Sequence, residues 1–271
     1  MRNFIAIIVI CFFGSCTVGL IQKGYITNPP NICLFDSAQD LNMKLTGNTR
    51  FLEHQGSYAF TKHWGIASNL FLGNRLQYGG DLGAVYYYRL NKRNYFECSA
   101  GYGYFNASST IGETRIFFNK YYYQEITSIY HKLYLQPSYF FTFKKNDLGL
   151  TARLSLPFFT SYHGVFSYDP YCGEYNYPAI KYADGGFKNK LGLTIEPVIT
   201  FRHRWKRVNF YMQFGLCFSK NIINRVDSVH WSDIDRYEGS QYPNYKNQQP
   251  LHANYFLNYG IEVSLNCKRK R

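Results

Sequence analysis

The sequence predicts an all-β protein, a single antiparallel up-and-down β-barrel of about ten strands that spans a membrane. Three observations predict this fold. From Leu41 onward, apolar and polar side chains alternate with a period of two residues, which is the repeat of a strand with two unlike faces. Most alternating segments are as long as the roughly 9–11 residues that a membrane-spanning strand needs. The links between them alternate between short and long, as membrane-spanning barrels connect their strands.

The segment from Asp81 to Leu90 illustrates the alternation. Leu82, Tyr86 and Leu90 fall on one face, and Asp81 and Gly83 fall on the other. Similar segments recur along the chain. They are predicted at residues 39–48, 51–61, 64–73, 79–90, 94–105, 129–143, 147–158, 188–202, 207–219 and 254–266.

The composition agrees with a membrane environment. Aromatic residues make up 20% of the chain and charged residues only 17%, whereas soluble domains carry about 25% charged residues. The 27 tyrosines have rings with one apolar and one polar end, which suits a membrane interface. A typical soluble enzyme is therefore disfavoured.

The first residues resemble a signal peptide, predicted over residues 1–15. Arg2 precedes an apolar run from Phe4 to Phe13 that is shorter than the roughly 20 residues of a transmembrane helix. The run ends in Phe13-Gly14-Ser15-Cys16, which resembles a bacterial lipobox with Cys16 as the acylated residue. Residues 16–38 are then predicted to be a lipidated linker. The alternative is an ordinary signal peptide with cleavage nearby.

Charge separates the two predicted ends of the barrel. The formal net charge is +13, and much of its excess lies in short turns and in the basic tail, residues 267–271. Long links are predicted at 74–78, 106–128, 159–187 and 220–253, and only Asp147 is acidic among the turns. The turns are expected to face the periplasm, and the barrel proper is predicted to cover residues 39–266.

The inner face of the barrel is predicted to hold a network of paired charges, because buried charges are tolerated when they are paired. Arg89 and Glu97 are expected to face each other across a turn. The network stabilises the barrel in one interpretation and lines a narrow polar conduit in another. Its predicted members are Glu53, Asp81, Arg89, Glu97, Lys132, Arg153, Glu196, Arg202 and Glu262.

Several of these features together are similar to a known class of proteins. The signal ending in Gly14-Ser15-Cys16, the linker Asn28-Pro29-Pro30-Asn31 and the hairpin pattern from Gln55 to Gly65 resemble the small outer-membrane β-barrel lipoproteins of Bacteroidetes-type bacteria. The resemblance implies an outer-membrane location. It implies no chemistry.

Candidate catalytic and metal sites are weak. Ser161 with His163, and Ser228 with His230 and Asp233, lack the surrounding motif of a hydrolase. The acids Asp227, Asp233, Asp235 and Glu238 lack the spacing of a calcium loop. None of the seven cysteines forms a C-x-x-C pair. No catalytic residue, metal or cofactor is therefore predicted.

The predicted role is structural or surface interaction. Long links rich in tyrosine favour contact with a surface ligand or protein partner, and outer-membrane lipids are the other expected partners. Nucleic acid is not expected, since no binding motif accompanies the basic residues. The alternatives are a lipid-modifying hydrolase, a narrow solute channel, and a soluble barrel on a lipid tether with its apolar residues inside.

Overall fold

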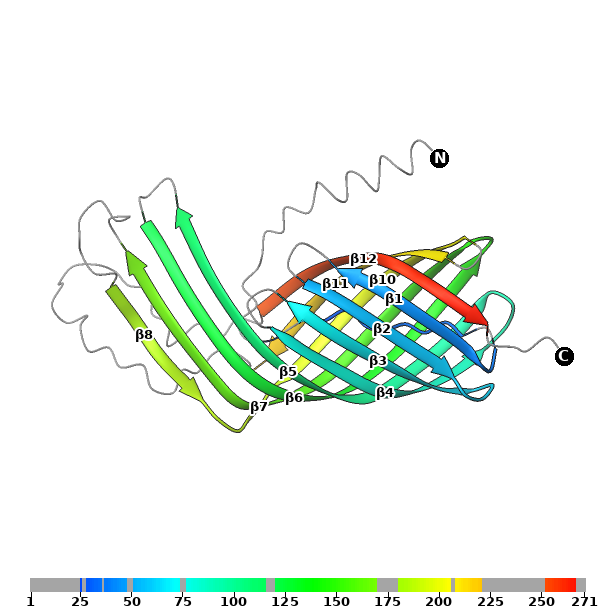
Figure 1. The fold of residues 1–271 in the computed structure, drawn as a ribbon, viewed down its shortest axis with the longest axis horizontal. Helices are drawn as coiled ribbons and strands as arrows, with labels where there is room; N and C mark the ends of the chain where they lie inside the picture. The colour runs from blue at the N-terminus through cyan, green and yellow to red at the C-terminus, as the bar shows by residue number, and fades with distance from the viewer. Residues whose placement is uncertain are drawn as a thin grey trace.

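The protein is built from antiparallel strands (Figure 1). The computed structural model describes residue 25 and residues 28–35, 37–47, 51–73, 77–115, 120–169, 180–205, 208–220 and 252–266. Its strands are β1 (Asp40–Gly47), β2 (Phe51–Ala59), β3 (Trp64–Gly73), β4 (Tyr78–Arg89), β5 (Asn94–Arg115), β6 (Lys120–Phe143), β7 (Asn146–Asp169), β8 (Ile180–Phe187), β9 (Lys190–Leu191), β10 (Leu193–Trp205), β11 (Val208–Lys220) and β12 (His252–Asn266).

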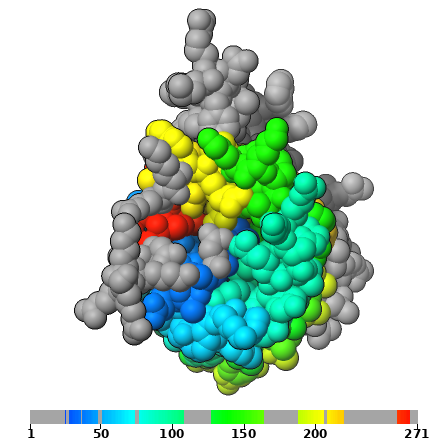
Figure 2. All heavy atoms as spheres, turned by 90° about the vertical axis from the view of Figure 1, so that its right-hand side faces the viewer, coloured from blue at the N-terminus to red at the C-terminus, as the bar shows by residue number. Residues whose placement is uncertain are grey.

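The strands close into a barrel. Each strand from β1 to β7 pairs with the next, β10 returns to β7, and β12 pairs with β1 from Asp40 opposite Asn266 to Gly47 opposite Tyr259. Figure 2 shows the short-turn end of the barrel, with β12 in red beside β1 in blue where the ring closes. The predicted all-β fold and its circumference of ten strands are confirmed.

Three of the labelled strands share one position in the ring. β8, β9 and β10 all pair antiparallel with β7 and follow one another along it. Asn189 has a positive φ of 56°, and the amide of Gly192 donates to the Pro157 carbonyl over 2.8 Å. One long strand is therefore interrupted twice, and the twelve labelled strands make a barrel of ten.

Four strands continue beyond the barrel rim as a sheet. The parts of β5, β6 and β7 nearest the long links, together with β8, pair in that order. They curve away from the barrel on its long-link side (Figure 1). The sequence predicts loops over 106–128 and 159–187, so this part of the prediction is wrong. Hydrogen bonds between neighbouring strands continue beyond the barrel rim, so the described parts of residues 106–128 and 159–187 are largely strand.

Side chains alternate between the two faces of the barrel wall. In β4, Asp81, Val85 and Tyr87 are buried, whereas Leu82 is 61% exposed and Tyr86 is 37% exposed. The same alternation runs through β2, β3 and β10. This is the reverse of the tethered soluble barrel, which would place its apolar residues inside, so that alternative is wrong.

Close packing inside the wall depends on Gly149. The Phe140 ring lies on β6 directly opposite Gly149 on β7, and a Cβ added at Gly149 would overlap that ring. We expect Gly149→Ala to lower the free energy of unfolding by about 1–3 kcal/mol, as overpacking does. Urea titration would measure it. Adding Phe140→Leu should restore part of the loss, and equal losses in the single and double variants would contradict this explanation.

Candidate functional site

The barrel lumen is occupied by the chain's own N-terminal segment. Tyr25 packs among Phe71, Phe105 and Tyr130, near the ends of the strands that lead into the long links. Phe35 packs at the other end, against Tyr87 and beside the short turns. Tyr25 and residues 28–35, here called the lumen segment, therefore run from the long-link end to the short-turn end, where β1 begins.

This arrangement differs from the predicted linker over residues 16–38. Ile32, Cys33 and Phe35 are at most 1% exposed, and Asn28 is fully buried. The chain then reverses direction into β1, with positive φ values at Leu34 and Gln39 and a hydrogen bond from the Ser37 amide to Asp40. The described part of the predicted linker therefore lies inside the barrel, at its centre.

Side chains of the wall bind the segment through its main-chain carbonyls. Each carbonyl oxygen from residue 28 to residue 33 accepts a hydrogen bond from a wall side chain. The donors, in chain order of the carbonyls, are Arg153 to Asn28, Gln55 and Arg153 to Pro29, Gln213 and Tyr211 to Pro30, Gln136 to Asn31, Lys44 to Ile32 and Asn42 to Cys33.

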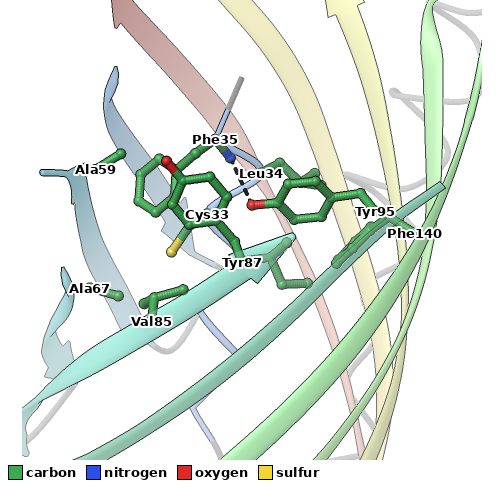
Figure 3. Packing of buried hydrophobic residues seen from close by; sticks show 10 residues of the cluster. Cys33, Leu34, Phe35, Ala59, Ala67, Val85, Tyr87, Tyr95 and Phe140 are labelled. Atoms are coloured by element: carbon green, nitrogen blue, oxygen red, sulfur yellow. Dashed lines mark hydrogen bonds between the residues drawn. The ribbon is translucent and has the colours of Figure 1, made fainter. Parts of the chain in front are cut away.

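The amides at the end of the segment are bound by a carboxylate and a phenol. Glu97, which is fully buried, accepts from the amide of Cys33 at 3.2 Å and from the amide of Leu34 at 3.1 Å. The Phe35 amide donates to the Tyr95 hydroxyl at 3.1 Å (Figure 3). Hydrogen bonds to a charged acceptor are worth roughly 1.5–3 kcal/mol each, so Glu97 is a main anchor of the segment.

Asn28 joins the segment to charges on the wall. Its side-chain nitrogen donates to Asp81 at 3.0 Å, and its side-chain oxygen accepts from Lys132 at 2.7 Å and from Arg153 at 3.2 Å. Arg153 also lies 3.8 Å from Glu196. The segment completes the hydrogen bonding of these buried charges, which would otherwise be costly in the interior.

A second group of charges lies nearer the short turns. Arg202 contacts Asp147 and Glu262, each at 2.8 Å, and Lys44 lies 3.6 Å from Glu262. Asp147 belongs to the wall and is 1% exposed, although the sequence places it in a turn. This group links β1, β7, β10 and β12 across the point where the barrel closes.

The predicted network is mostly found inside the barrel. Eight of its nine members are buried, namely Glu53, Asp81, Glu97, Lys132, Arg153, Glu196, Arg202 and Glu262. Many of their hydrogen bonds go to the lumen segment. Alternation alone would also have placed Lys44 and Gln136 inside, but it gives no sign that they bind a peptide.

Arg89 is the exception. It is exposed and lies opposite Tyr95, while Glu97 lies opposite Tyr87, so the expected Arg89–Glu97 pair is wrong. The Asn91 side chain accepts from the amides of Arg93 and Asn94 and closes the turn there, as an asparagine often does. β4 ends at Arg89, past the last buried residue of the strand, so Arg89 lies outside the lumen.

The catalytic candidates gain no support from the described residues. Ser161 and His163 lie on β7 beside Tyr162, whose side chain is buried, so the two neighbours point to the opposite face. Ser228, His230 and Asp233 lie outside the described residues, as do Asp227, Asp235, Glu238 and Cys16. No cluster of metal-ligating side chains occurs among the residues that the structure describes. Cys33, Cys98 and Cys217 are free thiols.

Fold and site together define the protein as a closed β-barrel of ten strands with an apolar exterior and a polar lumen. In the described part of the chain, no helix is long and apolar enough to cross a membrane.

Comparisons with known proteins give a distant structural likeness. No family model and no curated protein matches the chain. A solved structure described as "KdgM porin" aligns with 83% of this chain and 99% of its own, at 10% identity and a TM-score of 0.34. That likeness is too distant for any property of the porin to be transferred.

Proposed function

We propose that this protein is an outer-membrane β-barrel that presents a surface for interaction outside the cell. The exposed apolar belt carries the membrane part of the proposal. Leu70, Leu82 and Leu133 are each about 60% exposed, and large apolar side chains point outward from every long barrel strand. Soluble monomers rarely expose apolar patches larger than about a few hundred Å², whereas lipid would cover this belt.

The links favour one orientation in the membrane. The short turns carry Lys62, Lys92, Arg93 and Lys145, and short turns face the periplasm in barrels of this kind. Basic side chains there can contact anionic headgroups. The sheet formed by β5, β6, β7 and β8 beyond the rim then faces outward.

This outer sheet supports the surface role. Its strands include Tyr121, Tyr122, Tyr123 and Tyr168 in their sequences. Tyrosine buries a large area on binding for a small loss of side-chain entropy. A sheet of this kind is a platform for a ligand or a protein partner.

The membrane belt can be tested by placing charge at two depths on one strand face. Leu82 lies mid-strand on β4, and Tyr88 lies near its short-turn end. We expect Leu82→Arg to cost about 2–4 kcal/mol of unfolding free energy in lipid vesicles and Tyr88→Arg about 0–1 kcal/mol, because the penalty depends on depth. Folding titrations in vesicles would measure both. Equal, small costs at the two positions would reject membrane burial.

The surface role can be tested by shortening the β5–β6 hairpin. Residues 109–126 would be removed and the strands joined by Asn-Gly between Ser108 and Thr127, which lie opposite each other. Whole cells carrying either form would be compared for binding to a glycan array and to immobilised mucin. We expect binding to be lost with the outer sheet. Identical binding patterns, with equal amounts of folded barrel, would reject the surface role.

The proposal includes a lipid anchor at Cys16. Its support is the sequence Phe13-Gly14-Ser15-Cys16 after an apolar run. Incorporation of labelled palmitate in growing cells would test it, with Cys16→Ala as the control. A protein that takes up no label would carry no anchor, and the barrel would be held by its strands alone.

A further inference from the structure

The lumen segment is held only by side chains where the structure describes it. Residues 28–35 pair with no strand, and the six carbonyls, like the amides of Cys33, Leu34 and Phe35, are bound by wall side chains. A segment bound in this way can leave while the backbone hydrogen bonds of the wall remain intact. The barrel does not need it for closure, because β12 pairs directly with β1.

Removal of the segment would leave a lumen that must hold water. Arg153, Lys132 and Gln136 would lose their partners on residues 28–31. Buried polar groups require hydrogen bonds, and an unpaired buried charge is strongly disfavoured. Water is the ready replacement, and the space vacated by an extended peptide is wide enough to admit it.

The emptied lumen would be acidic. The buried acids outnumber the buried bases by seven to four among the described residues, and the described lumen segment contains no charged residue. The acids are Asp40, Glu53, Asp81, Glu97, Asp147, Glu196 and Glu262, and the bases are Lys44, Lys132, Arg153 and Arg202. Rings of carboxylates favour cations in a pore.

From these observations, we propose that the lumen segment is a removable plug and that the lumen behind it is a conduit for small cations. This inference rests on the proposed function, since a conduit requires a barrel in a membrane. The outer sheet and the plug are separate parts of the chain, so the surface role does not depend on the conduit.

The first experiment compares the full chain with a shortened chain in planar bilayers of known salt gradient. In the shortened chain, the signal and Cys16 are joined directly to Ser37. The full chain is expected to be closed at low voltage. The shortened chain is expected to conduct, with a reversal potential of the sign that indicates selectivity for cations. A folded, inserted shortened barrel that conducts no more than the full chain overturns the plug.

A milder variant covers the case in which the shortened chain does not fold. Asn28→Ala combined with Asn31→Ala removes the bonds of both side chains to the wall and keeps the whole chain. It is expected to open at least several-fold more often than the wild type. Openings at the wild-type frequency overturn the proposal. Failure of the wild type itself to bind vesicles would instead overturn the membrane location.

A disulfide lock provides the matched control. Cys33 of the lumen segment and Ser57 on β2 are both buried inside the barrel, so Ser57→Cys places a second thiol on the wall that a disulfide could join to the plug. Oxidised channels are expected to remain closed at voltages that open the wild type, and reduction should release them. Ser57→Ala should respond to neither treatment. Mass spectrometry would verify that the Ser57→Cys protein carries a disulfide to Cys33. Channels that carry this disulfide and still open would contradict gating by the segment.

Discussion

Arg202→Met is expected to lower the free energy of unfolding by about 3–5 kcal/mol, because it removes the positive partner of buried carboxylates. Asp147 and Glu262 each lie 2.8 Å from the guanidinium and are almost fully buried. Without Arg202 the cations left beside the two acids would be Lys44 at Glu262 and the partly exposed Arg204 at Asp147. Urea titration of the folded barrel in detergent would measure the loss.

Arg204 supplies the control for this experiment. It contacts the same Asp147 at 3.4 Å, but its side chain is 32% exposed. Ion pairs open to solvent contribute about 0–1 kcal/mol, so Arg204→Met should have a small effect. Similar losses for the two variants would show that burial does not determine the strength of this group. Adding Glu262→Gln to Arg202→Met should recover part of the stability.

Glu97→Ala is expected to release the short-turn end of the lumen segment. The change removes the acceptor of the Cys33 and Leu34 amides and leaves both buried, at a cost of roughly 1.5–3 kcal/mol or more. Since about 1.4 kcal/mol is a factor of ten in an equilibrium constant, hydrogen exchange in residues 31–35 should rise at least tenfold. Exchange in β1 should change much less.

Glu53→Gln is the matched control for Glu97. Glu53 is also fully buried, but one of its carboxylate oxygens accepts no hydrogen bond among the described residues. Gln keeps the size and the hydrogen-bonding capacity of this side chain, so the exchange in residues 31–35 should remain unchanged. Faster exchange in both variants would point to general loosening of the barrel and would contradict a specific anchoring role for Glu97.

The wall of the barrel could be predicted from the sequence because it depends on local alternation. The pattern over residues 79–90 predicts a strand with Leu82 outside and Asp81 inside, and β4 has this arrangement. In such a strand, odd-numbered and even-numbered residues point to opposite faces of the wall. The burial of Glu196 and Glu262 follows from the same rule.

The occupant of the lumen could not be predicted in this way. The segment Asn28-Pro29-Pro30-Asn31 has neither alternation nor helical period, and its two prolines favour a linker. Its position depends on donors from distant strands, such as Gln136 and Gln213. The outer sheet could not be predicted for a related reason, since β8 is held by pairing with β7.

The occupied lumen also favours an order of assembly. The wall surrounds the segment once the first and last strands pair, from Asp40 opposite Asn266, so the segment has its widest access to its binding side chains before that pairing forms. The seam between these strands joins the two ends of the barrel sequence, and pairing between segments so distant in sequence is intrinsically slow. In this order, the barrel forms around the lumen segment, and the pairing of β12 with β1 is the last step.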